Sequence, residues 1–431
     1  MLNSRNGIQT THVGSLPRPD DLIEANRARE AGEGNEAGFQ QTLRKSVHDI
    51  VRQQKNTGVT IPNDGEFGKS MGQRVNYRAW VMYVYARLGG LTPLGTSSSG
   101  ALTKKSQPGD LVLRAIAERR DRIRFKGAYS DPESGVYMGP GAMTLMRPAC
   151  TEPVKYTGQA AIAADIANFK DALKANGYKE GFMTAVAPGS ASRIVNHYYK
   201  TDEEFMFAVA DAMREEYKAI IDAGLILQLD DPAIAENWDS IDPEPSVAAY
   251  KKFTMRRVEA LNHAIRGLPE DRIRFHLCWG SWHGPHTTDL PMKDIIDVMF
   301  RIKAQGYTFE AANARHEHEW SVWKEHKLPA GKIIIPGIVG HATNVVEHPE
   351  LVAERIVRFA NVVGKENVIA STDCGLGGRI HPEIAWAKLE ALSQGAKLAT
   401  KQLWSKGAKK AAKKAPAKKS AKRSAKKAKR R

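Results

Sequence analysis

A histidine and two cysteines stand where short apolar runs of the sequence end. His276 and Cys278 lie two residues apart in the run RIRFHLCWG (272–280), and Cys374 belongs to the run NVIASTDCG (367–375). If these runs are strands, the two-residue repeat of a strand points His276 and Cys278 to the same side of the sheet. Imidazole and thiolate groups brought together in this way can share a metal ion.

An acidic residue joins this set. Glu310 lies in YTFEAAN (307–313), the run that follows the one with His276. Adjacent strand ends would then deliver His276, Cys278, Glu310 and Cys374 to one rim. Zinc prefers such tetrahedral imidazole and thiolate ligation, whereas magnesium and calcium prefer oxygen ligands alone. The sequence therefore predicts one Zn²⁺ site made of these four side chains.

Further polar side chains follow other apolar runs, namely Ser15, Glu66, Asp230 and His341. A carboxylate at a strand end can bind a cationic substrate group, act as an acid or base, or cap the next helix. For Glu66 and Asp230 we favour binding of a cationic substrate group. Rival metal ligands are the histidines of SWHGPH and ARHEHEW: His283, His286, His316 and His318. Because they follow the strand ends, we predict surface or substrate-contact roles for them.

Eight apolar runs alternate with helical patterns along the chain. The runs are 7–15, 59–66, 182–189, 225–232, 272–280, 307–313, 332–340 and 367–375. Amphipathic stretches, such as 202–222, 248–266 and 349–363, lie between most of them. This alternation predicts a parallel sheet, and eight repeats predict a single closed (β/α)₈ TIM barrel over residues 1–404. Reacting groups of such barrels lie at the carboxyl ends of the strands, where the predicted ligands stand.

Residues 90–157 interrupt the alternation. They contain a polar segment, LTPLGTSSSGALTKKSQPGD, and the segment 136–158 is predicted to form a hairpin. An insertion after the second strand of a barrel lies over the mouth, because the loops at that face surround the active site. We therefore expect this insertion to act as a lid.

The positive charge of the chain is concentrated at its end. Of 64 Lys and Arg residues, 14 lie in residues 406–431, which leaves 50 basic against 48 acidic residues in the remainder. Residues 405–431 form a Lys/Ala-rich segment that we predict to be disordered when free. Such a segment can bind nucleic acid or another polyanion through phosphate charge, or can serve only to keep the protein soluble.

The remaining features indicate a cytoplasmic protein. Three cysteines, Cys150, Cys278 and Cys374, are too few and too widely spaced for a disulfide framework, which fits a reducing compartment. No run of 18 apolar residues occurs, so no membrane segment is expected. The N-terminal residues do not have the pattern of a secretory signal. These features leave the oligomeric state open.

Several motifs together resemble the catalytic barrel of cobalamin-independent methionine synthase. The matching residues are Thr10, Thr11, Gly14, Ser15 and Pro17; Gly65 and Glu66; Gln228, Asp230, Asp231, Pro232 and Ala233; His276 and Cys278; Glu310; and Asp373, Cys374, Gly375 and Leu376. They occur in the same order over about residues 8–390. The resemblance implies homocysteine S-methylation, with Ser15, Glu66 and Asp230 holding the amino acid part of homocysteine. It also implies a general-acid role for His341 and zinc ligation by the four residues above.

The expected partners are a small-molecule thiol and a methyl or alkyl donor. A free thiol is mostly protonated at pH 7, whereas a zinc-bound thiol is deprotonated and remains nucleophilic. HLCWGSWHGPH is also similar to short relatives that include epoxyalkane:coenzyme M transferase, in which a thiol opens an epoxide. A sulfonate on that thiol would need cations, and Arg18, Arg74 and Arg78 are expected near the mouth.

Two alternatives belong to other classes of protein. One is a nucleic-acid-associated protein that acts through residues 406–431 and keeps the barrel for structure. The other is a metal-dependent hydrolase, which we disfavour because zinc sites that activate water usually use histidines and carboxylates without two cysteines.

Overall fold

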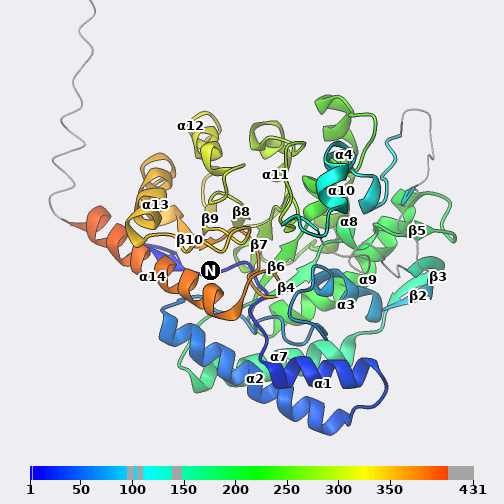
Figure 1. Ribbon diagram of the computed structural model, residues 1–431, viewed down its shortest axis with the longest axis horizontal. Coiled ribbons are helices and arrows are strands. Elements are labelled where there is room, and N and C mark those ends of the chain that lie inside the picture. Colours follow the sequence, from blue (N-terminus) through cyan, green and yellow to red (C-terminus); the bar gives the residue numbers. More distant parts are fainter. Residues whose placement is uncertain (2, 95–100, 104–109, 138–147, 406–431) are drawn as a thin grey trace, which may run out of the picture.

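The computed structural model of the chain describes residues 1, 3–94, 101–103, 110–137 and 148–405. Seven parallel strands form one curled sheet in the order β1-β10-β9-β8-β7-β6-β4, and helices lie around it (Figure 1). The strands are β1 (Gln9–Thr10), β4 (Phe182–Val186), β6 (Ile226–Asp230), β7 (Ile273–His276), β8 (Gly306–Phe309), β9 (Ile333–Val339) and β10 (Ile369–Thr372). Each overlaps one apolar run, so the predicted parallel sheet is confirmed.

The remaining expected strand, residues 59–66, is not recorded as a strand. Its backbone nevertheless bonds to both edges of the sheet. The N–H groups of residues 60 and 61 donate to the carbonyl of Thr10 at 3.0 Å, and Phe182 N–H donates to the carbonyl of Pro62 at 2.9 Å. Pro62 has no N–H of its own, so it cannot donate to a ladder. The observed sheet therefore has seven strands, and a closed eight-stranded barrel is not confirmed.

The longer helices lie between the strands along the chain or, for the last one, follow β10. They are α1 (Asp20–Glu30), α2 (Glu36–Thr57), α3 (Ala79–Ala86), α7 (Gln159–Ala175), α9 (Asp202–Asp222), α10 (Val247–Ala264), α13 (Pro349–Val363) and α14 (Pro382–Trp404). Shorter ones are α4 (Arg120–Arg124), α5 (Lys126–Ser130), α8 (Pro188–Ala191), α11 (Ile296–Met299) and α12 (Val322–Glu325). The predicted helices 202–222 and 349–363 have these bounds as α9 and α13. A search of the described helices found none both long enough and apolar enough to cross a bilayer.

Side-chain caps explain where several helices begin. The side chain of Asn35 accepts from the first turn of α2, that of Thr201 from Glu204 N–H in α9, and that of Ser246 from α10. These contacts satisfy N–H groups that have no partner within the helix. Helix α2 ends at Gly58, whose φ of 91° is the left-handed conformation that glycine adopts easily.

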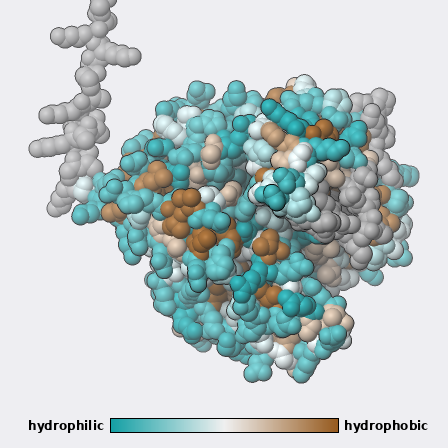
Figure 2. Space-filling view, viewed as in Figure 1, coloured by the Kyte–Doolittle hydropathy of each residue, from teal (hydrophilic) through white to brown (hydrophobic). Residues whose placement is uncertain are grey.

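The sheet separates two apolar cores. The larger one lies between the strands and the surrounding helices. The smaller one lies on the inner face and consists of Ile61, Phe182, Ile226, Ile333, Ile335 and Ile369. Alternation along β9 explains the division, because Ile334 belongs to the larger core and its neighbours on either side to the smaller one. On the outside, the face shown in Figure 2 is mainly hydrophilic.

A fully buried arginine lies one layer above the smaller core. Arg274 of β7 donates from Nε to Gln228 Oε1 of β6 at 2.6 Å. It also donates to Thr11 Oγ1 at 3.0 Å and to the carbonyl of His12 at 2.5 Å, both just after β1. These bonds tie β6 and β7 to the chain that follows β1. Because side chains repeat every two residues, His276 lies directly above Arg274 on the same face.

The insertion contributes strands to a second, three-stranded sheet. Strand β3 (Pro148–Tyr156) pairs antiparallel with β2 (Leu88–Pro93) and parallel with β5 (Val195–Asn196). The second arm of the hairpin predicted over 136–158 thus pairs with β2, an edge more than fifty residues away in the chain. Residues 138–147, the other part of that hairpin, lie outside the described residues.

Candidate metal centre

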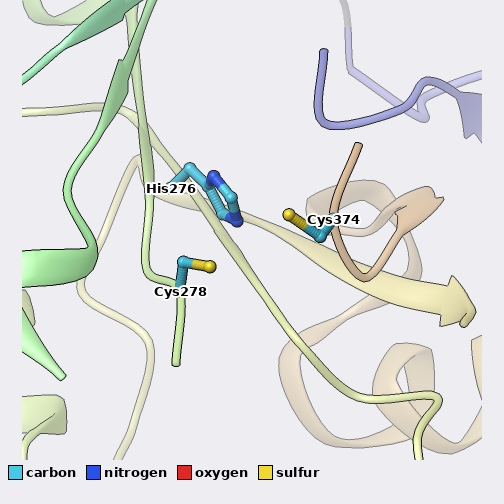
Figure 3. A group of neighbouring side chains, drawn as sticks. All are labelled: His276, Cys278 and Cys374. Carbon is cyan, nitrogen blue, oxygen red and sulfur yellow. The ribbon is translucent and has the colours of Figure 1, made fainter. Parts of the chain in front are cut away.

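Three of the four predicted metal ligands converge across the curl of the sheet. His276 ends β7, Cys278 lies two residues further, and Cys374 lies two residues beyond β10. Their ligand atoms all lie within 4.8 Å of one another, and all three side chains are buried. Figure 3 shows the imidazole ring and the two sulfur atoms gathered around a common space. This set can hold a metal ion, and its donors are those that zinc prefers.

Asp230 orients the imidazole of His276. Asp230 Oδ1 lies 3.0 Å from His276 Nδ1, and the two residues are paired in register between β6 and β7. Nε2 on the other side of the ring is buried and has no hydrogen-bond partner among the described residues. Buried polar atoms are normally bonded, and a carboxylate behind the ring is a common companion of a metal-binding histidine. The unpartnered Nε2 therefore fits a metal ligand.

The two thiols differ in acidity in the metal-free protein. A hydrogen bond from Cys278 and the charges of His276 and Arg379 together outweigh the effect of burial and lower the pKa of Cys374 to about 6. The same contact and burial raise the pKa of Cys278 well above its usual value. For His276, burial lowers the pKa, but Asp230 and Cys374 raise it more. Of the two thiols, Cys374 is thus the one that ionises more readily, and ionised thiols are the form that binds a metal ion.

Glu310 belongs to a neighbouring group of side chains rather than to this one. It follows β8, and its ligand oxygen lies within 4.8 Å of those of His341 and Asp373. Trp279 N–H donates to Glu310 Oε1 at 3.1 Å, and Asn313 donates to Oε2 at 2.8 Å. Burial raises the pKa of Glu310 to about 8. The structure does not bring it into the three-residue set, and its role as fourth ligand stays a prediction.

His341 is buried, and neither ring nitrogen has a partner among the described residues. Burial, followed by the charge of Arg379, lowers its pKa well below the usual value. The ring is therefore neutral at neutral pH. The general-acid role expected for His341 stays a prediction.

The three residues expected to bind substrate line one cavity together with His276, Cys278 and Cys374, which we call the metal set. Ser15, Glu66 and Asp230 all face it. Ser15 donates to the carbonyl of Gly377 at 3.2 Å. Glu66 adopts the left-handed conformation, with φ 61°, and accepts from Thr184 Oγ1 at 2.6 Å. The structure therefore brings the predicted substrate residues to the metal set, while their contact with a substrate stays a prediction.

The rival histidines have other partners. His316 is buried, with Nδ1 2.8 Å from Glu319 and Nε2 3.1 Å from Asp289. Asp289 also lies 2.9 Å from Nδ1 of His286, whose Nε2 lies 3.0 Å from the carbonyl of Trp282. A surface role is therefore wrong for His316. It and His286 instead join two loops that surround the metal set.

The cavity encloses about 1310 Å³, including space open to solvent. The metal set and strand ends form one side of it. Residues of the insertion form the other side, namely Leu102, Leu113, Arg114, Ile116, Arg119 and Arg122. The described part of the insertion thus lines the cavity, and its role as a lid over the mouth stays a prediction.

Of the three arginines expected near the mouth, only Arg78 lines the cavity. Arg18 is buried and donates to the carbonyls of Glu66 and Lys69. Arg74 is exposed and pairs with Asp20 at 2.6 Å. The positions of Arg18 and Arg74 correct the sequence-based expectation, which rested on proximity in the chain alone.

Other cavity residues were missed from the sequence. Arg379 lines the cavity five residues after Cys374, in DCGLGGR, where its closeness to a ligand was a usable signal. Arg119 lines it from the opposite side and lies 2.5 Å from Glu236. Its guanidinium lies over the ring of Trp282, 4.7 Å from the centroid. No spacing in the sequence marks Arg119, because its partners are more than a hundred residues away.

Comparison with known proteins agrees with this geometry. Residues 109–398 match the family model described as cobalamin-independent synthase, catalytic domain. A methionine synthase of Sulfolobus acidocaldarius is 23% identical over 406 residues, which cover 93% of this chain and 94% of the relative. One of Saccharolobus islandicus is also 23% identical, over 405 residues that cover 93% of this chain and 97% of that relative.

Solved structures share the fold. A B12-independent methionine synthase from Shewanella sp. W3-18-1, in complex with selenomethionine, aligns with a TM-score of 0.66 at 17% identity. That alignment covers 92% of this chain and 99% of the other. A putative B12-independent methionine synthase from Listeria monocytogenes aligns with a TM-score of 0.59 at 20% identity, over 91% of this chain and 98% of the other. With its metal-ligand set inside the matched region, the chain belongs to the cobalamin-independent synthase catalytic-domain family.

Proposed function

We propose that this protein is a methyltransferase that methylates the thiol of homocysteine to give methionine, with a zinc ion held by His276, Cys278, Glu310 and Cys374. The observation that carries the proposal is the convergence of one imidazole and two thiols, with the buried Nε2 of His276 lacking a partner among the described residues. Family membership and the methionine synthases among the relatives support homocysteine as the acceptor.

When bound, zinc would supply the Lewis acid that keeps a substrate thiol deprotonated at neutral pH. The protein's own residues prepare for this. Asp230 holds the proton of His276 on Nδ1 and so leaves Nε2 as a donor of electrons. Burial of Cys278 and Cys374 keeps water from competing with the thiol.

The acceptor and donor would occupy different sides of the cavity. Ser15 and Asp230 lie at the strand ends and would contact the amino acid part of homocysteine, together with Glu66. The selenomethionine bound by the Shewanella protein supports an amino acid of this kind in the fold. The methyl donor would approach from the opposite side, where Leu102 and Leu113 offer an apolar wall.

The test compares two cysteine variants by metal analysis and by methionine formation. Cys374→Ser should lose most of its zinc and reduce turnover roughly a thousandfold, because one soft ligand is replaced by a weak one. Cys150→Ser is the matched control, since Cys150 is equally buried but lies in the three-stranded sheet. Full activity of Cys374→Ser without metal would end the proposal.

A second candidate is the opening of an epoxide by a sulfonate-bearing thiol. The observation that favours it is the arginines of the cavity, including Arg78 and Arg379. Zinc-loaded protein incubated with homocysteine plus methyl donors, and separately with coenzyme M plus epoxides, distinguishes the two by the mass of the product. A thioether formed only from coenzyme M would replace homocysteine methylation as the function.

Two further sequence-based expectations remain proposals. Residues 59–66 would complete an eight-stranded barrel, supported by their bonds to both sheet edges. Residues 406–431 would bind nucleic acid or another polyanion through their 14 cationic side chains. Deletion of residues 406–431 should abolish salt-sensitive retention on a polyanion column and leave methyl transfer unchanged. Lost transfer would instead make that segment part of the enzyme.

A further inference from the structure

Two carboxylates beside the metal set are buried without a cation to balance them. Glu310 is 3% exposed and Asp373 is fully buried. Within the described residues, neither of them forms an ion pair with a lysine, an arginine or a histidine. A buried carboxylate in such surroundings has to be satisfied by hydrogen bonds. The donors of these bonds therefore decide where the two carboxylates lie.

Most of the donors belong to the three residues that follow Glu310. Asp373 Oδ1 accepts from the N–H groups of Ala311 at 2.7 Å and Ala312 at 2.9 Å. Asn313 Nδ2 donates to Glu310 Oε2 at 2.8 Å and to Asp373 Oδ2 at 3.1 Å. An amide nitrogen carries two hydrogens and can serve both acceptors at once. Asn313 thus links the two carboxylates to each other.

The amide of Asn313 is itself held in one orientation. Its Oδ1 accepts from the N–H groups of Arg315 and His316, both at 3.0 Å. Its backbone carbonyl accepts from the N–H group of Glu317 at 2.9 Å. Because N–H groups can bond only to the oxygen end of an amide, the nitrogen end must face the carboxylates. The link is therefore specific to an amide at this position.

Strand β9 leaves room for this link. It lies between β8 and β10 in the sheet, and Gly337 belongs to it. A Cβ on Gly337 would lie 2.1 Å from Asp373 Oδ1, so any other residue there would displace the carboxylate. The link thus runs from the residues after β8, past β9, to the residue that directly precedes Cys374.

Both ends of the link lead to predicted metal ligands. Glu310 Oε2 is held by Asn313, while Oε1 accepts from the N–H group of Trp279, the residue after Cys278, at 3.1 Å. Asp373 is adjacent to Cys374 in the chain. Residues that hold a ligand by hydrogen bonds commonly tune the metal affinity of a site. Asn313 does not line the cavity, so its influence has to pass through these two carboxylates.

We infer that Asn313 is a positioning residue of the metal centre, which fixes the carboxylate of Glu310 relative to Cys374 by its bonds to Glu310 and Asp373. The inference rests on the proposed function, in which Glu310 is the fourth zinc ligand. It adds a residue that touches neither the ion nor the substrate.

The first measurement is zinc affinity, determined by competition with a chelator. Asn313→Ala should bind zinc about 10- to 100-fold more weakly, because Glu310 is no longer held. Asn367→Ala is the matched control and should keep the affinity of the wild type. Asn367 is also half-buried and donates from Nδ2 at 2.8 Å, to the carbonyl of Val363, but it lies at the opposite end of β10 from Cys374.

A double-mutant cycle asks whether Asn313 acts through Glu310. Glu310→Gln should itself weaken zinc binding. In that background, Asn313→Ala should change the affinity by less than about twofold, because the two substitutions disrupt the same interaction. A further loss of tenfold or more, on the order of the effect in the wild type, would show that the two residues act independently and would overturn the inference.

The absorption spectrum of the Co²⁺-loaded protein separates positioning from a general loss of stability. Cobalt absorption depends on the number and kind of ligands around the ion. The spectrum of Asn313→Ala should therefore resemble that of Glu310→Gln, whereas Asn367→Ala should give the spectrum of the wild type. A wild-type spectrum for Asn313→Ala would mean that Glu310 is placed without help from Asn313.

The outcomes distinguish this inference from the proposed function. If Cys374→Ser binds zinc as tightly as the wild type, the proposed zinc centre fails, and this inference fails with it. If Cys374→Ser loses zinc but Asn313→Ala keeps it, the zinc centre stands and only the role of Asn313 is refuted.

Discussion

The two sides of the cavity are built in different ways. On the strand side, Cys278 and Cys374 extend from β7 and β10, whose backbones are fixed by parallel ladders. On the insertion side, Arg119 and Arg122 lie in or beside α4, a helix of only five residues, which is tied to the chain after β6 by the Arg119–Glu236 ion pair and by the bond from Arg120 N–H to the carbonyl of Asp239. The comparison teaches that the positions of His276, Cys278 and Cys374 are fixed by the strands of the sheet, whereas those of the arginines on the insertion side also need ion pairs such as Arg119–Glu236. We therefore expect variants on the two sides to affect different properties.

The largest effect should come from Glu236→Gln, which breaks the link between the two sides. Glu236 is buried and pairs with Arg119 and Arg193, so its loss removes the carboxylate that compensates these two cations and should lower the free energy of unfolding by about 3 kcal/mol. Burial raises the pKa of Glu236, but these arginines lower it more, to about 2. Urea unfolding at pH 7 measures the effect.

The pH dependence of this difference follows from the sign of the shift. Because the folded pKa of Glu236 lies below the usual value of 4.5, its stabilisation is complete above that pH and is lost as the pH falls toward about 2. The difference between the wild type and Glu236→Gln should therefore shrink as the pH falls from 4.5 toward about 2. A constant difference over this range would show that the charge of Glu236 is not what stabilises the wall.

A smaller effect, confined to the strand side, is expected for Asp230→Asn. An amide can still contact His276 Nδ1 but no longer carries the charge that supports a protonated Nδ1. Zinc affinity should fall about 10- to 100-fold, as for other partners that lie behind a metal-binding histidine. Competition with a chelator measures this affinity. Unchanged affinity would argue against a role for Asp230 in orienting the ring.

The smallest effect should come from Arg119→Gln on the insertion side. Glu236 keeps Arg193 as its partner, so stability should fall less than in Glu236→Gln, and metal content should be unchanged. The KM for the donor or the acceptor should rise about tenfold, because one cation of the wall is removed. Arg124→Gln is the control, since Arg124 is exposed on the same helix. Lost zinc in Arg119→Gln would show that the two sides are not independent.

The difference between the two sides of the cavity also explains which residues could be predicted from the sequence. His276, Cys278 and Cys374 were found because strand periodicity and strand ends are local patterns, and helices α9 and α13 because their apolar faces and caps are local too. Arg119 could not be found, since its position depends on Glu236 and Trp282, which are far away in the chain. The pairing of β3 with β2 could not be predicted for the same reason, because the two strands are far apart in the chain.

For Glu310, the position could be predicted but not the side-chain contacts. Its place at the end of β8 was expected, but the position of a residue in a strand does not determine which neighbouring side chains its carboxylate contacts. Bonds from Trp279 and Asn313 direct its carboxylate toward His341 and Asp373.

The buried layer of Arg274 and Gln228 beneath the metal set limits the direction from which a small molecule can reach His276. Arg274 and Gln228 are fully buried and bonded to each other, and Arg274 also bonds to Thr11, so they seal the interior below His276. Molecules bound at His276 must enter and depart through the side that the insertion covers.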